Sequence, residues 1–274
     1  MFHWLYLQLF VAKSRFLNKR FSTHYVLNLF NIVLAIFQKE IGSFFNSLIA
    51  YIVMAVFLTA IGLIVWVFPD SNILDYGFAD MQSFFSLTPY VLIFLIPAIT
   101  MRSLAEESKN GTLELLLTKP IRNRDLILGK FFANWALVMI MILPTLLYYF
   151  SIHQLGNPEG NIDSAAVFGS YMGLLLFCGV LVSMGLWCSS LNDNQIVAFV
   201  LAVFLGFFWY TGFSSLSELS GSGVLADLLS WISLDTQYSA LGKGLIDSRN
   251  VVFMMSLLSF FLYLIYCRVE TLRK

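Results

Sequence analysis

The residue types that usually carry catalysis or bind metals form no recognisable active-site motif in this chain. No HExxH, GxSxG or GxxxxGK[ST] sequence occurs, so the usual signatures of zinc hydrolysis, serine hydrolysis and P-loop phosphate binding are missing. The three histidines, His3, His24 and His153, lie at the ends of expected elements. We therefore expect no catalytic, cofactor-binding or metal-binding residue here and no enzyme activity.

The three cysteines are expected to be buried thiols. Cys178, Cys188 and Cys267 lie in or at the ends of apolar runs, with no CxxC spacing and no histidine nearby in the sequence. This pattern favours packing within membrane helices over metal binding or a disulfide.

A hydrophilic island at residues 102–130 could instead dock a soluble partner. It reads RSLAEESKNGTLELLLTKPIRNRDLILGK and contains ten of the 32 Lys, Arg, Asp and Glu residues, which predicts a water-facing loop. Within it, Asn110-Gly111-Thr112 predicts a turn followed by a helix start, because glycine adopts unusual backbone angles and threonine can cap free amides.

A two-turn helix with one apolar face is expected after this turn. Leu113, Leu116 and Leu117 share that face. The helix must end near Lys119, because Pro120 disfavours helical geometry in the residue before it. Displayed beyond the ends of two membrane helices, this element could be a docking helix, and the alternative is a plain solvated connection.

The composition identifies an integral membrane protein. Hydrophobic residues make up 59% of the 274 residues and charged residues only 12%, against about 25% charged in soluble domains. The apolar runs approach the roughly 20 residues that cross a bilayer as a helix. We expect an all-α, polytopic fold with six transmembrane helices, at 44–68, 84–101, 131–150, 165–188, 196–213 and 251–267. The net charge of zero predicts no nucleic-acid partner.

Further elements are expected around these spans. Residues 26–41 have helical apolar spacing and predict an N-terminal interfacial helix, preceded by a cytoplasmic tail at 1–25. Between spans five and six, apolar faces predict two short helices separated near Ser233, too short to cross and able to re-enter the outer leaflet. The fourth span is rich in Gly and Ser, which predicts a place at the bundle centre or at a subunit contact.

The basic residues predict the orientation. Fourteen of the sixteen Lys and Arg residues fall on the side that holds both termini and the island, and only Lys243 and Arg249 fall on the other. Cytoplasmic loops carry the positive excess, so we expect the island and both termini in the cytoplasm. None of the six span cores contains Asp, Glu, Lys or Arg, which disfavours an ion-coupled secondary transporter.

The island also resembles the cytoplasmic loop of ABC-2 type transporter permeases. The resemblance lies in the run EExxxGTLExLLxxPI from Glu106 to Ile121, closing with Gly129-Lys130. It covers residues 26–274, which would form the ABC-2 transmembrane domain, and leaves out the first 25 residues. In that family this loop forms the coupling helix that contacts the ATPase. The resemblance implies the same architecture: an interfacial helix, six spans, both termini inside, and short re-entrant helices between spans five and six.

Within the family the chain is most similar to the permease subunit associated with gliding motility in Bacteroidetes. Three stretches carry this narrower resemblance: FQKEIGSFFNSLIAYIVMAVFLTAIGL, FLIPAITMRSLAEESKNGTLELLLTKPI and LSWISLDTQYSALGKGLIDSRNVVF. It implies a bacterial inner-membrane location and a separate cytoplasmic ABC ATPase that binds ATP and magnesium. It also implies a second permease copy or a paralogous membrane subunit, which in gliding systems has a large periplasmic domain.

The expected function is that of a permease subunit driven by an ATPase supplied in trans. The residues expected to couple the two are those that match the motif, namely Glu106, Glu107, Gly111, Thr112, Glu114, Leu117 and Pro120. Two alternatives stay open: a membrane scaffold of a motility or secretion assembly without transport of its own, and a secondary transporter or channel. An apolar bundle suits an amphipathic or lipid-linked cargo and equally suits ordinary helix packing.

Overall fold

The computed structural model describes residues 32–69, 72–73, 80–118, 121–157, 159–221, 223–244 and 247–273. Within these ranges all regular structure is helical, and six helical stretches are long and apolar enough to cross a membrane. They are Leu48–Trp66, Gln82–Lys109, Asn123–Leu155, Ser164–Leu191, Gln195–Leu219 and Ser248–Arg273. The prediction of an all-α protein with six spans is confirmed, and the tail at 1–25 lies outside the described residues.

The helices follow in this order along the chain. A helix at 32–45 comes first. After it come α2 (Leu48–Trp66), α3 (Gln82–Thr100), α4 (Arg102–Lys109), α5 (Thr112–Thr118), α6 (Asn123–Ile142), a 3₁₀ turn (Leu143–Thr145), α7 (Leu146–Leu155), α8 (Ser164–Leu191), α9 (Gln195–Phe207), a π segment (Phe208–Gly212), α10 (Phe213–Leu219), α11 (Val224–Ile232), α12 (Leu234–Leu241) and α13 (Ser248–Arg273). The two short helices expected around Ser233 are α11 and α12.

Short polar side chains begin several of these helices, because the first amides of a helix have no partner within it. The Asp163 carboxylate accepts hydrogen bonds from the amides of Ala165 and Ala166 and so begins α8. Asn194 begins α9 in the same way, with its side-chain oxygen 3.0 Å from the Ile196 amide. Asn194 lies in the three-residue turn between α8 and α9, and the two helices pack against each other.

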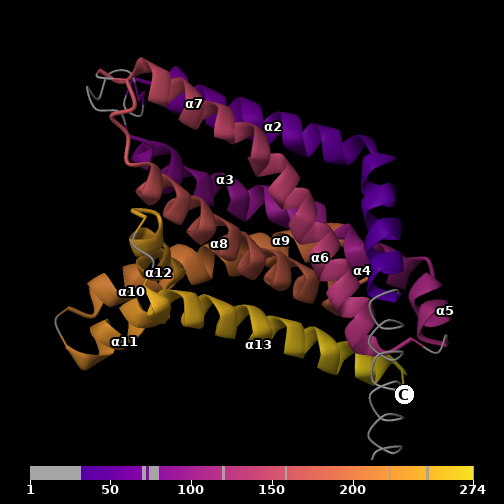
Figure 1. The fold of residues 1–274 in the computed structure, drawn as a ribbon. Coiled ribbons are helices and arrows are strands. Elements are labelled where there is room, and N and C mark those ends of the chain that lie inside the picture. The colour runs from indigo at the N-terminus through magenta and orange to yellow at the C-terminus, as the bar shows by residue number, and fades with distance from the viewer. Residues whose placement is uncertain are drawn as a thin grey trace, which may run out of the picture.

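Helix α8 lies in the middle of the bundle. It contacts α3, α4, α6, α9, α12 and α13, and Figure 1 shows it between α2 and α7 on one side and α13 on the other. The same figure places α5 at one end of the bundle and α10, α11 and α12 at the opposite end. Of the two places predicted for the small residues of the fourth span, the bundle centre and a subunit contact, the single chain shows the first.

Glycines let other elements approach α8 very closely. A Cβ built on Gly185 would clash with the side chain of Thr100 on α3, lying 2.9 Å from its Cβ. At the other end of α8, a Cβ on Gly169 would lie 2.7 Å from the carbonyl oxygen of Gly244, which itself has a φ of +78°. Close backbone approach of this kind is the usual role of small residues in membrane helices.

The Gly185 contact gives a test of this packing. Gly185→Ala should lower the free energy of unfolding by about 1–3 kcal/mol, because a buried methyl group has to displace α3 from α8. Gly42→Ala is the matched control, since a Cβ there meets no atom within 4 Å and alanine favours helix. Thermal unfolding of the two purified variants measures both effects. Equal melting temperatures for Gly185→Ala and the unchanged protein would contradict the close contact.

Candidate functional site

The predicted island is helical over most of its length, which corrects the expectation of a water-facing loop. Helix α4 follows α3 with only Met101 between them, and α6 already begins at Asn123. The two spans therefore continue as helices beyond their apolar cores, because helical hydrogen bonding does not depend on the hydrocarbon. The turn predicted at 110–112 is present, and Gly111 adopts a φ of +67°, which favours glycine.

Helix α5 has a buried face and an exposed face. Leu113 is buried at 5% exposure in the chain's own core, and Leu116 packs partly against the same core. Two of the three leucines of the predicted apolar face, Leu113 and Leu116, therefore pack against the chain's own core, and α5 contacts α4 and α13. The exposed side presents Leu115, at 66% exposure, next to Glu114.

A cluster of four charged residues lies beside α5 at the same end of the bundle, with Lys130 and Glu40 buried and Lys39 exposed at its edge. The Lys130 ammonium, on α6, lies 2.8 Å from a Glu40 carboxylate oxygen and 2.9 Å from a Glu107 oxygen. Its side chain is only 2% exposed. Lys39 lies 2.7 Å from the other oxygen of Glu107. The cluster contains two positive and two negative groups and joins the helix at 32–45, α4 and α6.

Polar groups around Lys130 complete its environment. The ammonium also donates to the carbonyl of Ser103, at 2.6 Å. The side-chain amide of Asn134, one turn further along α6, donates to the Ser103 hydroxyl and to the Lys130 carbonyl. Gly129 lets the N-terminal helix approach, because a Cβ there would lie 2.7 Å from Ile36 Cγ2. Lys130 is thus desolvated but fully surrounded by acceptors, which is what a buried charge requires.

A half-open cavity of about 270 Å³ borders this cluster. It lies between the helix at 32–45 and α4, with Lys39 at its edge. Burial lowers the pKa of the Lys39 ammonium, but the pairing with Glu107 and Glu40 more than offsets this, so the pKa is raised and the group stays charged. Among the described residues, no group of three or more His, Cys, Asp or Glu side chains could hold a metal ion.

Helix α4 is also fastened to the turn between α8 and α9. The Ser189 hydroxyl, on α8, donates to the Met101 carbonyl and accepts from the amides of Leu104 and Ala105. At the other end of α4, the Ser108 hydroxyl bonds to the Asp193 carboxylate. Ser189 therefore satisfies the backbone where α3 passes into α4, and a displacement of α4 must also move α8 and α9.

The end of α13 is fastened to the link between α5 and α6. Arg273 donates to the Ile121 carbonyl at 3.2 Å and to the Asn123 side-chain oxygen at 2.9 Å. Arg124 also lies over the ring of Tyr266 on α13, 5.7 Å from its centroid. Helix α5 is therefore held on both sides by the ends of longer helices.

The residues predicted to couple with a partner divide into two groups. Gly111, Thr112 and Glu114 are exposed at the end of the bundle, whereas Glu107 points inward to the lysines, and Glu106 pairs with Arg102 at 3.1 Å. The Thr112 hydroxyl donates to the Glu107 carbonyl and so closes the turn. Leu117 belongs to α5 by its backbone, and its side chain and Pro120 lie outside the described residues.

Sequence reasoning missed Glu40 and Lys130 as members of the site. Glu40 is 6% exposed and Lys130 is 1% exposed, although both seemed to flank apolar runs. The available signal was the placement of one acidic and one basic residue at the polar ends of adjacent apolar stretches. An acidic and a basic residue in these positions can form an ion pair if the two stretches pack against each other.

The cluster can be tested by removing one positive charge and then, in addition, one negative charge. Lys130→Met should destabilise the protein by about 3–5 kcal/mol, because it leaves two buried carboxylates with one lysine at the edge. Adding Glu40→Gln should recover much of this loss by restoring neutrality. Lys109→Met, at an exposed position on α4, is the control and should unfold at the unchanged temperature. A double variant no more stable than Lys130→Met would contradict the charge pairing.

Comparison with known proteins identifies the family of this architecture. Residues 32–269 match the family described as ABC-2 family transporter protein. The match includes every span, the helix at 32–45 from its first described residue, α4 and α5, and the buried charge cluster. A search of curated proteins found no match. Because the family match covers most of the chain, the protein belongs to the ABC-2 family of transporter proteins, as a membrane permease subunit and not as the ATPase itself.

Proposed function

We propose that this chain couples ATP hydrolysis, carried out by a separate cytoplasmic ABC ATPase, to movement of a substrate or of force across the membrane. The family implies an ABC ATPase partner and a membrane setting. ATP and magnesium would be bound by that partner. The observation that carries the proposal is α5, a short helix seated on the chain's own core by Leu113 while Leu115 remains exposed at the end of the bundle.

The contacts around α5 suggest how its movement would be transmitted. Helix α5 packs on α4, and α4 continues into α3. Glu107 links α4 to the N-terminal helix through Lys39 and to α6 through Lys130. A partner that shifted α5 would therefore act on two spans, α3 and α6, and on the N-terminal helix. Rigid helices joined by buried ion pairs transmit such a shift because the pairs resist separation.

The basic residues support a cytoplasmic position for this end of the bundle. Within the described residues, Lys39, Arg102, Lys109 and Lys130 lie at the α5 end, while Lys243 and Arg249 lie toward the opposite end. By the positive-inside rule, both termini would be cytoplasmic in the inner membrane of a bacterium. Helices α11 and α12 would then lie at the outer surface, where the apolar side chains of α11, including Leu225 and Trp231, are exposed and suited to lipid.

The complex would contain a second membrane subunit, either another copy of this chain or a paralogue with a large periplasmic domain. Apolar side chains of α2 and α9, including Ile52, Val56, Val200 and Phe204, are exposed in the single chain and could face lipid or such a subunit.

A role in gliding motility rests only on the resemblance in the three sequence stretches quoted above. Substrate-stimulated ATPase activity would distinguish a transporter from a scaffold, and dependence on an ion gradient would identify a secondary transporter or channel.

The two faces of α5 allow docking to be separated from folding. Leu115→Asp should abolish co-purification of the ATPase, because it places a charge in an apolar contact, and should leave insertion and thermal stability unchanged. Leu113→Asp should instead destabilise the permease itself. Glu114→Gln, beside the docking face, should weaken association by about 1 kcal/mol or less. Pull-down of the ATPase with membrane insertion checked in parallel measures these effects. Normal ATPase recovery with Leu115→Asp would overturn the docking role of α5.

The orientation can be tested with single cysteines. In a background that lacks Cys178, Cys188 and Cys267, Asn110→Cys and Ser220→Cys place thiols at exposed positions at opposite ends of the bundle. A thiol reagent that cannot cross the membrane, added to intact cells, should label position 220 and leave position 110 unlabelled until the cells are opened. The reverse labelling would place α5 outside and remove the basis for contact with a cytoplasmic ATPase.

A further inference from the structure

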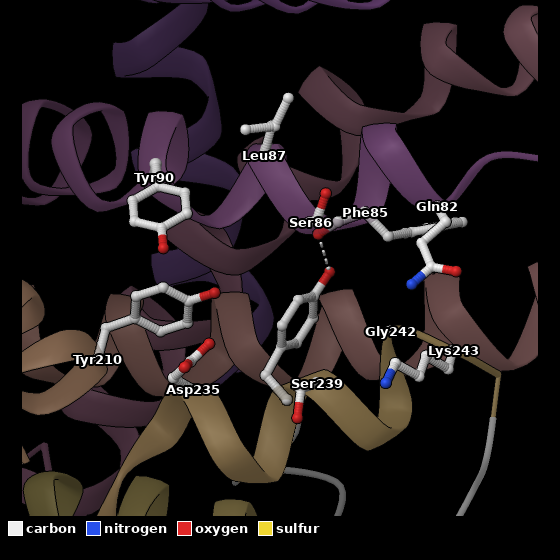
Figure 2. A pocket seen from close by; sticks show the side chains of 11 residues that line it. Gln82, Phe85, Ser86, Leu87, Tyr90, Tyr210, Asp235, Ser239, Gly242 and Lys243 are labelled. Atoms are coloured by element: carbon white, nitrogen blue, oxygen red, sulfur yellow. Dashed lines mark hydrogen bonds between the residues drawn. The ribbon is translucent and has the colours of Figure 1, made fainter. Parts of the chain in front are cut away.

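A second, half-open cavity of about 350 Å³ lies at the end of the bundle opposite α5. Its walls come from the start of α3, the π segment and α12, with Tyr90, Tyr210 and Tyr238 as its aromatic lining. Figure 2 shows Tyr90 and Tyr210 at the cavity, with Asp235 at one end and Lys243 and Gln82 at the other. The volume falls within the range of about 300–1,000 Å³ that is typical of small-molecule sites.

Two side-chain hydrogen bonds to backbone carbonyls join the walls of this cavity. Pro89 has no amide hydrogen to bond the carbonyl of Phe85, one turn earlier on α3. The Tyr238 hydroxyl donates to that carbonyl instead, at 2.8 Å (Figure 2). The Ser233 hydroxyl donates to the carbonyl of Tyr210 in the π segment, at 3.0 Å. Helix α12 is therefore fixed at a set distance from α3, and Tyr238 is almost fully buried.

The hydroxyl groups between the two ends of the cavity already donate to backbone carbonyls. Ser86 donates its proton to the Ser83 carbonyl, and Ser239 donates to the Thr236 carbonyl. Tyr238 is committed to Phe85 in the same way, and burial raises the pKa of its hydroxyl well above the usual value, so it stays protonated. A hydroxyl whose proton is engaged offers only lone pairs to a ligand. The middle of the cavity therefore favours a ligand that donates hydrogen bonds.

The two ends of the cavity have opposite charge. Asp235 begins α12 and Lys243 lies just beyond its end, about 12 Å apart along the helix axis. Within the described residues neither side chain forms an ion pair. Beside Asp235 the rings of Tyr90 and Tyr210 meet edge to face, with centroids 5.3 Å apart. In Figure 2 the nitrogen ends of Lys243 and Gln82 converge on the opposite end.

We propose that this cavity binds the zwitterionic headgroup of an ethanolamine phospholipid. The ammonium group would lie between Asp235, Tyr90 and Tyr210, where a carboxylate and aromatic rings both favour a cation. The phosphate would lie toward Lys243 and the amide of Gln82. The site uses the two charges that no ion pair neutralises, and the Asp235 carboxylate also accepts a hydrogen bond from the Tyr210 hydroxyl.

The surface of α3 next to the cavity favours a lipid over a soluble headgroup. Tyr90 and Phe94 are one turn apart on the same face of α3, with exposures of 42% and 49%. Phe94 packs against Phe207 of α9, with ring centroids 5.1 Å apart. An acyl chain leaving the cavity would therefore run along an apolar aromatic surface within the membrane-spanning part of α3. The inference uses only this cavity and does not depend on the docking role of α5.

The experiment measures lipid retained by the purified protein in native mass spectrometry. The protein is equilibrated in detergent with equal amounts of phosphatidylethanolamine and phosphatidylglycerol of the same acyl chains. Phosphatidylethanolamine should be retained about tenfold over phosphatidylglycerol, since the latter has the phosphate but lacks the ammonium, and a charged hydrogen bond contributes at least this factor. Added soluble phosphoethanolamine should not displace the lipid at equal concentration.

Two variants test the two ends of the cavity one at a time. Asp235→Asn should reduce retention of phosphatidylethanolamine about tenfold and leave phosphatidylglycerol unchanged, whereas Lys243→Gln should reduce both lipids. Asp227→Asn, on α11 outside the cavity, is the matched control and should change neither. Melting temperatures of the lipid-free variants show whether each one is folded.

Three outcomes would overturn the proposal. One is equal retention of the two lipids by the unchanged protein, and another is the same loss in Asp227→Asn as in Asp235→Asn. The third is displacement of the lipid by soluble phosphoethanolamine at equal concentration, which would leave the headgroup chemistry intact and assign the cavity to a soluble ligand. Loss of phosphatidylethanolamine selectivity in folded Asp235→Asn alone is the result that supports it.

Discussion

The buried ammonium of Lys130 imposes the strictest requirement on this fold. A charge removed from water must be neutralised and hydrogen-bonded, and here both carboxylates come from other helices, Glu40 from the N-terminal helix and Glu107 from α4. Neither helix can move away without leaving an unpaired charge. The N-terminal helix, α4 and α6 are therefore held as one unit, and Gly129 provides the space that lets this unit close.

A second requirement comes from backbone groups that lose their partners where helices are interrupted. In a membrane these groups cannot turn to water, so another part of the protein must satisfy them. Ser189 does so where α3 passes into α4, Tyr238 does so before Pro89, and Ser233 does so at the π segment. Each of these side chains comes from a different helix than the group it satisfies. The interruptions therefore fix how the helices are arranged as well as where they bend.

The sequence predicted the elements better than their surroundings. Hydropathy predicted all six spans. The positions of Gly111 and Pro120 predicted where α5 begins and ends. The small residues of α8 predicted a place for that helix at the bundle centre or at a subunit contact. The spacing of Leu113 and Leu116 correctly gave a common face, but periodicity does not say which part of the protein covers a face, and here it is the chain's own core. The turn at Gly111 could be predicted from the local sequence, because it depends on the backbone angles of that glycine.

The charge cluster and the outer cavity could not be read in this way, because both depend on contacts between distant parts of the chain. Glu40 and Lys130 are 90 residues apart, and each alone resembles a residue at the polar end of an apolar run. The cavity combines Tyr90, Tyr210 and Asp235 from three elements. No short motif contains them, and Tyr210 lies in the π segment, where the helical phase changes.

The close contact between Gly185 and Thr100 has a mechanical consequence for α3. It lies near the joint at Met101, which Ser189 also holds to α8, so it is a natural pivot for tilting of α3 and α4 together. At 1.5 Å per residue, the arm from Thr100 to Lys109 is about 13 Å, and the arm from Thr100 to Phe85 is about 22 Å. A small displacement of α4 would therefore produce a larger and opposite displacement at the far end of α3, so the helix acts as a lever that gains stroke at the expense of force.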